Sequence, residues 1–255
     1  MKLGAQLYSV RTHLKNEEDS RAAFARLAKT GYENVQLSGA AELTAEIWRD
    51  ISEESGLPIV VTHSSFKRIV EDTDALIAEH KTMNCPMIGL SNMPKEYTGT
   101  REALEAFFKV MEEPVKKIRE AGLNFSYHNH NFEFVIPEGS DKPLYDVMLE
   151  SQPDWQFILD TYWVEFAGYN AIEYLRKVGG KRLVNVHYKD MAHDEERSIC
   201  ACGQGRLDFK AITDVCLELG VVNVLVEQDN AVKFDPFEQM QSSFDHLRPI
   251  IPREI

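Results

Sequence analysis

The sequence predicts a single (β/α)8 TIM barrel, and three observations support this α/β fold class. Short apolar runs alternate with longer amphipathic segments, and the alternation repeats eight times along the chain. The chain has 255 residues, of which 44% are hydrophobic, and α/β barrels of this length are routinely one domain. No G-x-G-x-x-G turn follows the first predicted strand, which disfavours the alternative of an open doubly wound sheet. We therefore expect one domain over residues 1–255.

Eight apolar runs are short enough to be strands and are bounded by turn residues or by a polar end. The strands are expected at residues 3–8, 34–37, 59–63, 86–90, 123–130, 155–160, 183–189 and 223–227. The fourth strand gives the weakest signal, because Gly89 and the neighbouring methionines dilute its apolar pattern.

Eight longer segments show the apolar spacing of amphipathic helices. They are expected at residues 17–29, 43–55, 66–81, 101–121, 144–151, 172–178, 209–219 and 236–247. Gly31, Gly56 and Gly220 follow the first, second and seventh of these segments, where a glycine commonly ends a helix. Pro114 lies inside the fourth segment, and we expect it to kink or divide that helix.

Composition and charge exclude several classes of protein. The net charge of −13 argues against nucleic-acid binding through a basic surface. The N-terminal residues lack the pattern of a signal peptide, and no apolar run reaches the roughly 18 residues that span a bilayer. The four cysteines are scattered, and Cys200 and Cys202 lack zinc-ribbon spacing, so we expect reduced thiols. We expect a soluble, cytoplasmic protein without a nucleic-acid or membrane partner; homo-oligomerisation stays open.

Polar residues collect at the carboxyl ends of the predicted strands, where the active site of a (β/α)8 barrel lies. In strand order they are Gln6 and Tyr8, Gln36 and Ser38, His63 and Ser65, Asn92, His128, His130 and Glu133, Asp160 and Trp163, His187 and Lys189, and Glu227. Alternation along a strand at 123–130 would put His128 and His130 on one face, with Glu133 just beyond its end. Imidazole and carboxylate groups without thiolates suit one divalent ion, with Mn, Mg, Co, Zn and Fe all compatible.

Several of these residues have a structural alternative. A carboxylate at a strand end also serves as a helix N-cap, which is the alternative for Asp160 and Glu227. Lys189 is either a site residue or a structural cation paired with a loop carboxylate. The turn at 203–206 is either a simple turn or a phosphate site formed by backbone N–H groups and Arg206. A nucleophilic hydrolase is disfavoured, because no G-x-S-x-G elbow is present.

Four segments, at residues 6–11, 127–134, 159–164 and 186–190, resemble the sugar phosphate isomerase/epimerase family of the xylose isomerase-like barrel superfamily. The resemblance covers essentially the whole chain. It implies one divalent metal held by a carboxylate on strand five, an Asp on strand six, a His on strand seven and a Glu on strand eight. Asp160, His187 and Glu227 match this pattern. On strand five the epimerases have a glutamate where this chain has His128, so His128 and Glu133 are both candidate ligands.

The resemblance implies a metal-dependent sugar isomerase or epimerase that transfers a proton next to a carbonyl, through an enediolate stabilised by the metal. We expect His130, Glu227 and Lys189 to be catalytic. The residues expected to bind the sugar are Gln6, Tyr8, His63, Trp163 and Arg206, with Trp163 replacing an epimerase histidine and stacking on the sugar. The alternatives are a metal-dependent lyase or dehydratase acting on a keto-sugar or inosose, and a non-catalytic sugar-binding barrel. The superfamily's endonuclease chemistry is disfavoured by the acidic charge.

Overall fold

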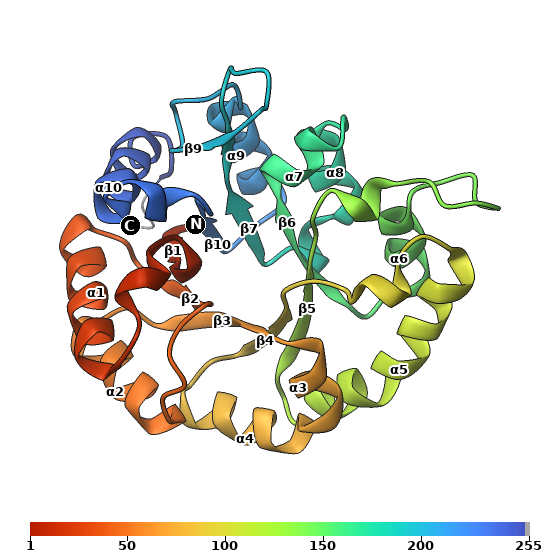
Figure 1. The fold of residues 1–255 in the computed structure, drawn as a ribbon, viewed down its shortest axis with the longest axis horizontal. Helices are drawn as coiled ribbons and strands as arrows, with labels where there is room; N and C mark the ends of the chain where they lie inside the picture. The colour runs from red at the N-terminus through yellow and green to blue at the C-terminus, as the bar shows by residue number, and fades with distance from the viewer. Residues whose placement is uncertain (253–255) are drawn as a thin grey trace.

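The computed structural model describes residues 1–252 and contains a closed barrel of eight parallel strands (Figure 1). The strands are β1 (Lys2–Gln6), β2 (Val35–Leu37), β3 (Ile59–Ser64), β4 (Met87–Leu90), β5 (Asn124–His128), β6 (Gln156–Asp160), β7 (Asn185–Tyr188) and β10 (Asn223–Val226). They follow one another around the barrel in chain order, and β10 closes it by pairing with β1. The predicted (β/α)8 fold is confirmed, and the open sheet is excluded.

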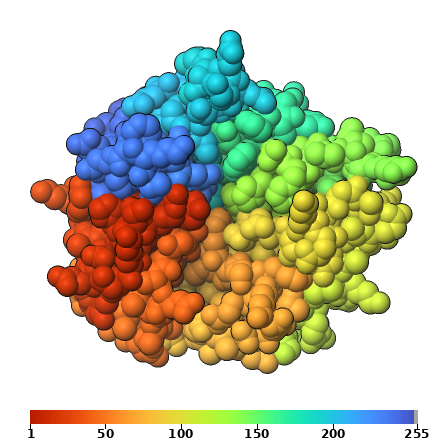
Figure 2. Space-filling view, viewed as in Figure 1, coloured from red at the N-terminus to blue at the C-terminus, as the bar shows by residue number. Residues whose placement is uncertain are grey.

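Helices surround the barrel, and the surface in the same view is hollowed near its centre (Figures 1 and 2). The helices are α1 (Glu17–Thr30), α2 (Ala45–Ser55), α3 (Phe66–Glu71), α4 (Thr73–Thr82), α5 (Arg101–Glu120), α6 (Leu144–Ser151), α7 (Thr161–Phe166), α8 (Ala171–Val178), α9 (Phe209–Glu218) and α10 (Pro236–Leu247). The 3-10 segments are η1 (Leu7–His13), which is kinked at Val10, and the single turns η2 (Lys95–Tyr97), η3 (Phe132–Phe134), η4 (Gly180–Arg182) and η5 (Ala231–Lys233). None of the helices in the described residues is long and apolar enough to cross a membrane.

Two predicted helices differ in detail from the structure. The segment expected as one helix at 66–81 is divided into α3 and α4, because Asp72 adopts φ −123° and ψ 31°, outside the helical region. Conversely, α5 continues through Pro114, so the expected division there is wrong. Pro114 is buried among the apolar residues of this helix, and their packing offsets the hydrogen bond that proline cannot make. Helix α7 and the hairpin of β8 (Asp190–Met191) and β9 (Ile199–Cys200) were not predicted.

Strand β5 ends at His128, two residues earlier than predicted. Beyond His128, hydrogen bonds between side chains and backbone N–H groups replace the backbone pairing of the strands. Asn129 Oδ1 accepts the backbone N–H of Asp160 at 3.0 Å, and Glu133 Oε2 accepts the backbone N–H of His130 at 2.8 Å. His130 therefore lies in a loop, and the expectation that it shares a strand face with His128 is wrong.

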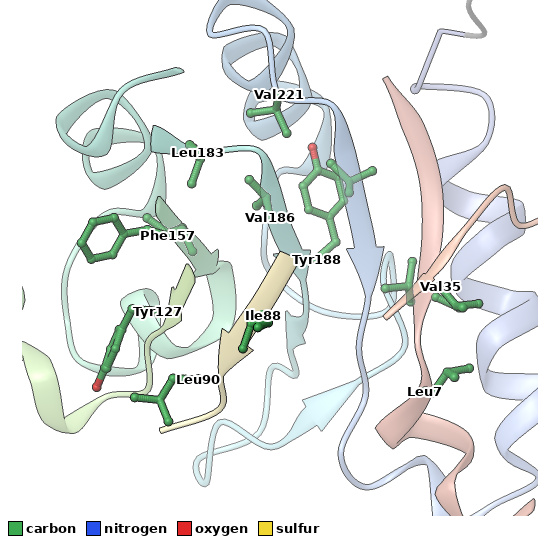
Figure 3. Close-up of a cluster of buried hydrophobic side chains, with 14 of the residues drawn as sticks. Leu7, Val35, Ile88, Leu90, Tyr127, Phe157, Leu183, Val186, Tyr188 and Val221 are labelled. Atoms are coloured by element: carbon green, nitrogen blue, oxygen red, sulfur yellow. The ribbon is translucent and has the colours of Figure 1, made fainter. Parts of the chain in front are cut away.

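Alternation along the strands separates two apolar layers. Val35, Ile88, Tyr127, Phe157 and Val186 belong to the large cluster of buried side chains between the strands and helices (Figure 3). Each fully buried aliphatic side chain in such a layer contributes about 2 kcal/mol. A smaller cluster inside the barrel consists of Val61, Met87, Ile158 and Leu225. This inner cluster closes the barrel below the polar residues at the strand ends.

Glycine is required where the barrel is narrow. A Cβ on Gly89 would overlap the carbonyl oxygen of Thr62, and a Cβ on Gly4 would overlap Asn34 Oδ1. Asn34 belongs to a chain of buried amides, since its Nδ2 donates to Asn223 Oδ1 at 2.7 Å. Gly89, which weakens the sequence signal of β4, is thus a packing requirement of that strand.

Candidate metal centre and active cavity

Four consecutive strands bring metal-ligating side chains together at one end of the barrel. His128 ends β5, Asp160 ends β6, His187 lies in β7 and Glu227 directly follows β10. One ligand atom from each lies within 4.8 Å of the others, and all four residues are buried. Donor atoms around one first-row metal ion lie at most about 4.5 Å apart, because each is about 2.0–2.3 Å from the ion. The group therefore has nearly the size of a metal site.

Asp160 combines the two functions that its sequence position suggests. Its Oδ1 accepts the backbone N–H of Trp163 at 3.2 Å and caps α7, while its Oδ2 belongs to the donor group. Capping fixes the carboxylate plane, so the helix that follows β6 orients a metal-ligand oxygen.

Each histidine of the group has one ring nitrogen fixed from outside. The outside partners are the Ser91 carbonyl oxygen, 3.0 Å from His128 Nδ1, and Gln36 Oε1, 2.6 Å from His187 Nε2. The other nitrogens face carboxylates, with His128 Nε2 3.4 Å from Asp160 Oδ2 and His187 Nδ1 2.9 Å from Glu227 Oε2. A neutral imidazole nitrogen and a carboxylate oxygen are both acceptors, so such a pair needs a proton or a cation between its atoms. A divalent ion meets that requirement.

Burial and charge act in opposite directions on these groups. Burial lowers the pKa of His128, and His187 lowers it further. Burial also opposes a charge on His187, but the carboxylates of Glu227 and Asp160 outweigh it and raise the pKa of His187. Although burial opposes their ionisation, the pKa values of Asp160 and Glu227 lie below the usual range, chiefly because of the Lys189 ammonium. Both carboxylates are therefore ionised.

Lys189 is a fully buried cation beside the same oxygens. Its Nζ lies 2.9 Å from Asp160 Oδ2, 2.9 Å from Glu227 Oε2 and 3.2 Å from Asp229 Oδ1. The carboxylates of Asp160, Glu227 and Asp229 outnumber this one ammonium, in a cluster where Asp160 is 0% exposed and Glu227 4% exposed. Uncompensated buried charge costs several kcal/mol, and one divalent cation would neutralise it. A divalent ion therefore fits the imidazole and carboxylate donors, the ring nitrogens that face carboxylates, and the excess of negative charge.

A cavity of about 410 Å³ lies next to the donor group. It is lined by Gln6, Tyr8, Ser38, Gly39, His63, Ser65, Ser91, Asn92, His128, His130, Lys189, Glu227 and Asp229. The structure thus brings Gln6, Tyr8 and His63 into one wall. Gln6 also donates from Nε2 to Glu227 Oε1 at 2.7 Å and fixes that carboxylate.

His130 reaches the same cavity from the loop after β5. Its ring centroid lies 4.8 Å from that of His128 and 5.4 Å from that of Trp163. Its Nδ1 has no hydrogen-bond partner within the described chain. Burial, His128 and Lys189 lower the pKa of His130 to about 3, so its imidazole is neutral near pH 7. Trp163 packs on His130 rather than lining the cavity, and sugar stacking by Trp163 stays a prediction.

Glu133 lies outside the donor group. Its Oε1 accepts the Tyr127 hydroxyl at 2.6 Å, and its Oε2 accepts the His130 N–H. Burial raises the pKa of Glu133 to about 7, although both hydrogen bonds act the other way. The expectation of Glu133 as a metal ligand is therefore not supported, because both its oxygens hold the loop that carries His130. His128 is the strand-five residue of the group that could hold a metal ion.

The turn at 203–206 is held by hydrogen bonds within the chain. The N–H groups of Gly203 and Gly205 both donate to Asp190 Oδ2 at 2.9 Å. Arg206 is exposed and donates to the Ala192 carbonyl at 2.8 Å, away from the cavity wall. Because Asp190 already uses these N–H groups, the structure favours the simple turn over the phosphate site, and substrate binding by Arg206 stays a prediction.

Asp229 is a cavity residue that the sequence did not indicate. It contacts Lys189, and its backbone oxygen accepts a hydrogen bond from Arg11 at 3.0 Å. Burial raises the pKa of Asp229 to about 6, against the effect of Lys189. Its one sequence signal is its position two residues after Glu227.

Comparisons with known proteins agree with this fold. A family model described as xylose isomerase-like TIM barrel matches residues 24–250. The crystal structure of a sugar phosphate isomerase/epimerase from Parabacteroides distasonis is similar, with 21% identity and a TM-score of 0.82 over 99% of this chain and 100% of that chain. The IOLI protein, solved with a zinc atom, has 14% identity and a TM-score of 0.77 over 98% of both chains.

A third similar structure is a probable 3-DHS dehydratase, AsbF, from Bacillus anthracis. It has 13% identity and a TM-score of 0.75 over 97% of this chain and 99% of that chain. At these identities the likeness shows the fold alone. No curated protein matches the sequence.

Proposed function

This chain belongs to the xylose isomerase-like TIM barrel family, and we propose that it is a divalent-metal-dependent sugar isomerase or epimerase. The buried donor group of His128, Asp160, His187 and Glu227 beside a polar cavity carries the proposal. A divalent ion held there would stabilise the negative charge that develops on substrate oxygens when a proton leaves the carbon next to a carbonyl. Imidazole and carboxylate ligands are compatible with Mn, Mg, Co, Zn or Fe.

In this proposal His130 and Glu227 transfer the proton. The free Nδ1 of His130 supports its assignment as the base. Glu227 lines the same cavity from β10, and β6 and β7 separate that strand from β5. Two groups arriving from separate strands approach a bound sugar from different directions, as removal and return of a proton on opposite faces requires.

Lys189 is proposed to stabilise the oxyanion of the substrate. Its ammonium lines the cavity and is held between Asp160, Glu227 and Asp229, so its position is fixed before substrate binds. Gln6, Tyr8 and His63 are proposed to bind sugar hydroxyls, since all three line the cavity.

A lyase acting on a keto-sugar or inosose is the second candidate, and Lys189 favours it. In a β-elimination, a base removes the proton next to the carbonyl and an acid protonates the leaving oxygen. His130 would be the base, and the Lys189 ammonium can supply the second proton. Both reactions begin with the same proton removal, so the same residues serve either one.

Incubation of a panel of ketoses, keto-sugars and inososes with the metal-loaded protein in D₂O tests the proposal by NMR. An isomerase or epimerase places deuterium on the carbon next to the carbonyl, whereas a lyase releases a second product. Neither exchange nor product across the panel would contradict both reactions and leave a sugar-binding barrel.

His130→Ala should slow the exchange by about 100-fold or more, because it removes the proposed base. Its metal content should not change, since His130 is outside the donor group. The exposed His193 lies outside the cavity wall, and His193→Ala is the matched control. Equal exchange rates in the two variants would assign the base to another residue.

A further inference from the structure

A larger cavity of about 820 Å³ adjoins the cavity at the donor group. The two share the residues Ser38, Gly39, His63 and Ser65 as a common wall. From this wall the larger cavity continues along residues 40–46 and along one side of α4. We call it the side groove. Figure 2 shows the central hollow bordered by the orange and yellow segments, which include the chain after β2 and β3.

His63 stands at the junction of the two cavities. Its Nδ1 is 3.4 Å from Ser38 Oγ, and its buried Nε2 has no hydrogen-bond partner within residues 1–252. An unpaired buried polar atom is destabilising, so a bound hydroxyl that pairs with Nε2 at this junction would be stabilised. Two other polar atoms of the groove lining are already satisfied, because His80 Nε2 and Thr62 Oγ1 pair with each other at 2.8 Å.

The charges of the side groove disfavour an anionic ligand. Its charged residues are Arg68, Glu42, Glu46 and Glu79. Arg68 is the one cation among them, and it already pairs with Glu79 at 2.8 Å. The remaining surface combines serine and threonine hydroxyls with alanines and with the larger apolar side chains Leu37, Leu43, Trp48, Leu76 and Met83. Such a mixture of polar and apolar groups suits an uncharged ring bearing hydroxyl groups.

We propose that the side groove binds the second ring of a neutral two-ring substrate, while the first ring, a keto-sugar, lies at the donor group. The inference rests on the proposed function, because that function places the reacting ring. It also selects the class of substrate, since a phosphate at the groove would meet three glutamates and an arginine that is already paired. The substrate is thus a disaccharide or glycoside rather than a sugar phosphate.

Binding of three ketoses to the metal-loaded protein tests this proposal. The three ketoses differ at position 6. Fructose carries only its hydroxyl there, fructose 6-phosphate carries a phosphate, and isomaltulose carries a neutral glucosyl ring. We expect isomaltulose to bind at least about tenfold more tightly than fructose, and the phosphate no more tightly than fructose. Dissociation constants from NMR titration measure both ratios.

Two variants of α4 provide a matched pair. Ala78 lines the side groove, whereas Ala75 is exposed on the same helix outside it. Ala78→Trp should abolish the advantage of isomaltulose and leave fructose binding unchanged, and Ala75→Trp should alter neither. The groove proposal is overturned if fructose binds and isomaltulose binds no better, or if Ala78→Trp keeps the advantage of isomaltulose. Either result leaves the proposed function standing. If no ketose binds, the proposed function fails with the groove proposal.

Discussion

At the scale of single residues, Lys189 has the largest effect on the charge of the site. Its ammonium is 2.9 Å from Asp160 Oδ2 and 2.9 Å from Glu227 Oε2, two oxygens that a divalent ion would use. A lysine ammonium and a metal ion are both attracted to these carboxylate oxygens, and their positive charges repel each other. We therefore expect Lys189 to lower the affinity of the proposed metal site, in addition to its proposed function in the reaction.

Replacement of Lys189 by methionine should strengthen metal binding while turnover is lost. Removing one positive charge leaves three carboxylates facing the ion, and an interaction change of about 1.4 kcal/mol corresponds to a tenfold change in affinity. We expect at least that increase for Mn²⁺ in calorimetric titration. Lys210→Met, at an exposed position of α9, is the control. Weaker or equal Mn²⁺ affinity in Lys189→Met would show that the ammonium does not compete with the ion.

Glu133 makes protein stability depend on pH. Its pKa is about 7 in the fold against an ordinary 4.5, because the carboxyl is buried. Between these values the folded protein holds a proton that the unfolded chain releases. The stabilisation is complete below about 4.5 and is lost as the pH rises through about 7. The difference between the two pKa values corresponds to roughly 3 kcal/mol in the free energy of unfolding.

Glu133→Gln keeps the shape and stays neutral, so the variant should gain stability relative to the wild type as pH rises from 5 to 8. The shift should approach roughly 3 kcal/mol in the free energy of unfolding, measured with urea at each pH. Metal content should stay unchanged. Glu195→Gln, at an exposed position, should show no shift. A pH-independent difference for Glu133→Gln would mean that burial does not perturb this carboxyl.

At the scale of elements, local pattern predicted the strands but not how they end. Runs such as Val224 to Val226 are apolar whatever surrounds them, so β10 was found from the sequence. The end of β5 depends on Asn129, whose partner, the Asp160 N–H, lies on the next strand. Gly89 weakened the sequence signal of β4, although that strand was predicted, because the absence of a side chain near Thr62 is a requirement that only the folded barrel shows.

Asp190 organises the loop between β7 and α9. Its Oδ1 accepts the N–H groups of Met191 at 2.7 Å and Leu207 at 3.1 Å, and its Oδ2 accepts those of Gly203 and Gly205. An asparagine would replace one accepting oxygen by an NH₂ group that faces N–H donors. Hydrogen bonds to a charged group contribute about 1.5–3 kcal/mol each.

Asp190→Asn should therefore lower the free energy of unfolding by about 3 kcal/mol, or open the loop locally. Urea denaturation measures the first effect, and faster hydrogen exchange of amides at 192–207 measures the second. Asp214→Asn, at an exposed position of α9, should change neither. Unchanged exchange and stability in Asp190→Asn would mean that the loop is held by other contacts.

At the scale of the whole molecule, barrel closure determines which polar residues meet. The rule that sites lie at the carboxyl ends of barrel strands sufficed to group Asp160, His187 and Glu227, because these positions follow from strand order alone. The rule could not separate His128 from Glu133, since both follow the same strand. Nor could it find Asp229, because its pairing with Lys189 depends on how the segments after the neighbouring strands β7 and β10 approach each other.

A donor group built from four strands would also couple metal binding to the stability of the whole barrel. The donor group exists only when β5, β6, β7 and β10 are side by side, so a divalent ion binds the folded chain and not the unfolded one. An ion at 100 times its dissociation constant stabilises a fold by about 2.7 kcal/mol. In a domain of this size that corresponds to a rise in Tm of roughly 5–10 °C.

A chelator should therefore lower the Tm of the wild type by roughly 5–10 °C, and Mn²⁺ should restore it. Asp160→Asn should abolish this shift, because it removes an anionic ligand while its remaining side-chain oxygen still caps α7. Asp214→Asn should keep the full shift, which controls for nonspecific effects of metal and chelator. Equal shifts in both variants would mean that the ion binds elsewhere, whereas no shift in the wild type would contradict a resident metal. Because unfolding needs no substrate, this measurement tests the metal centre even if the sugar is never identified.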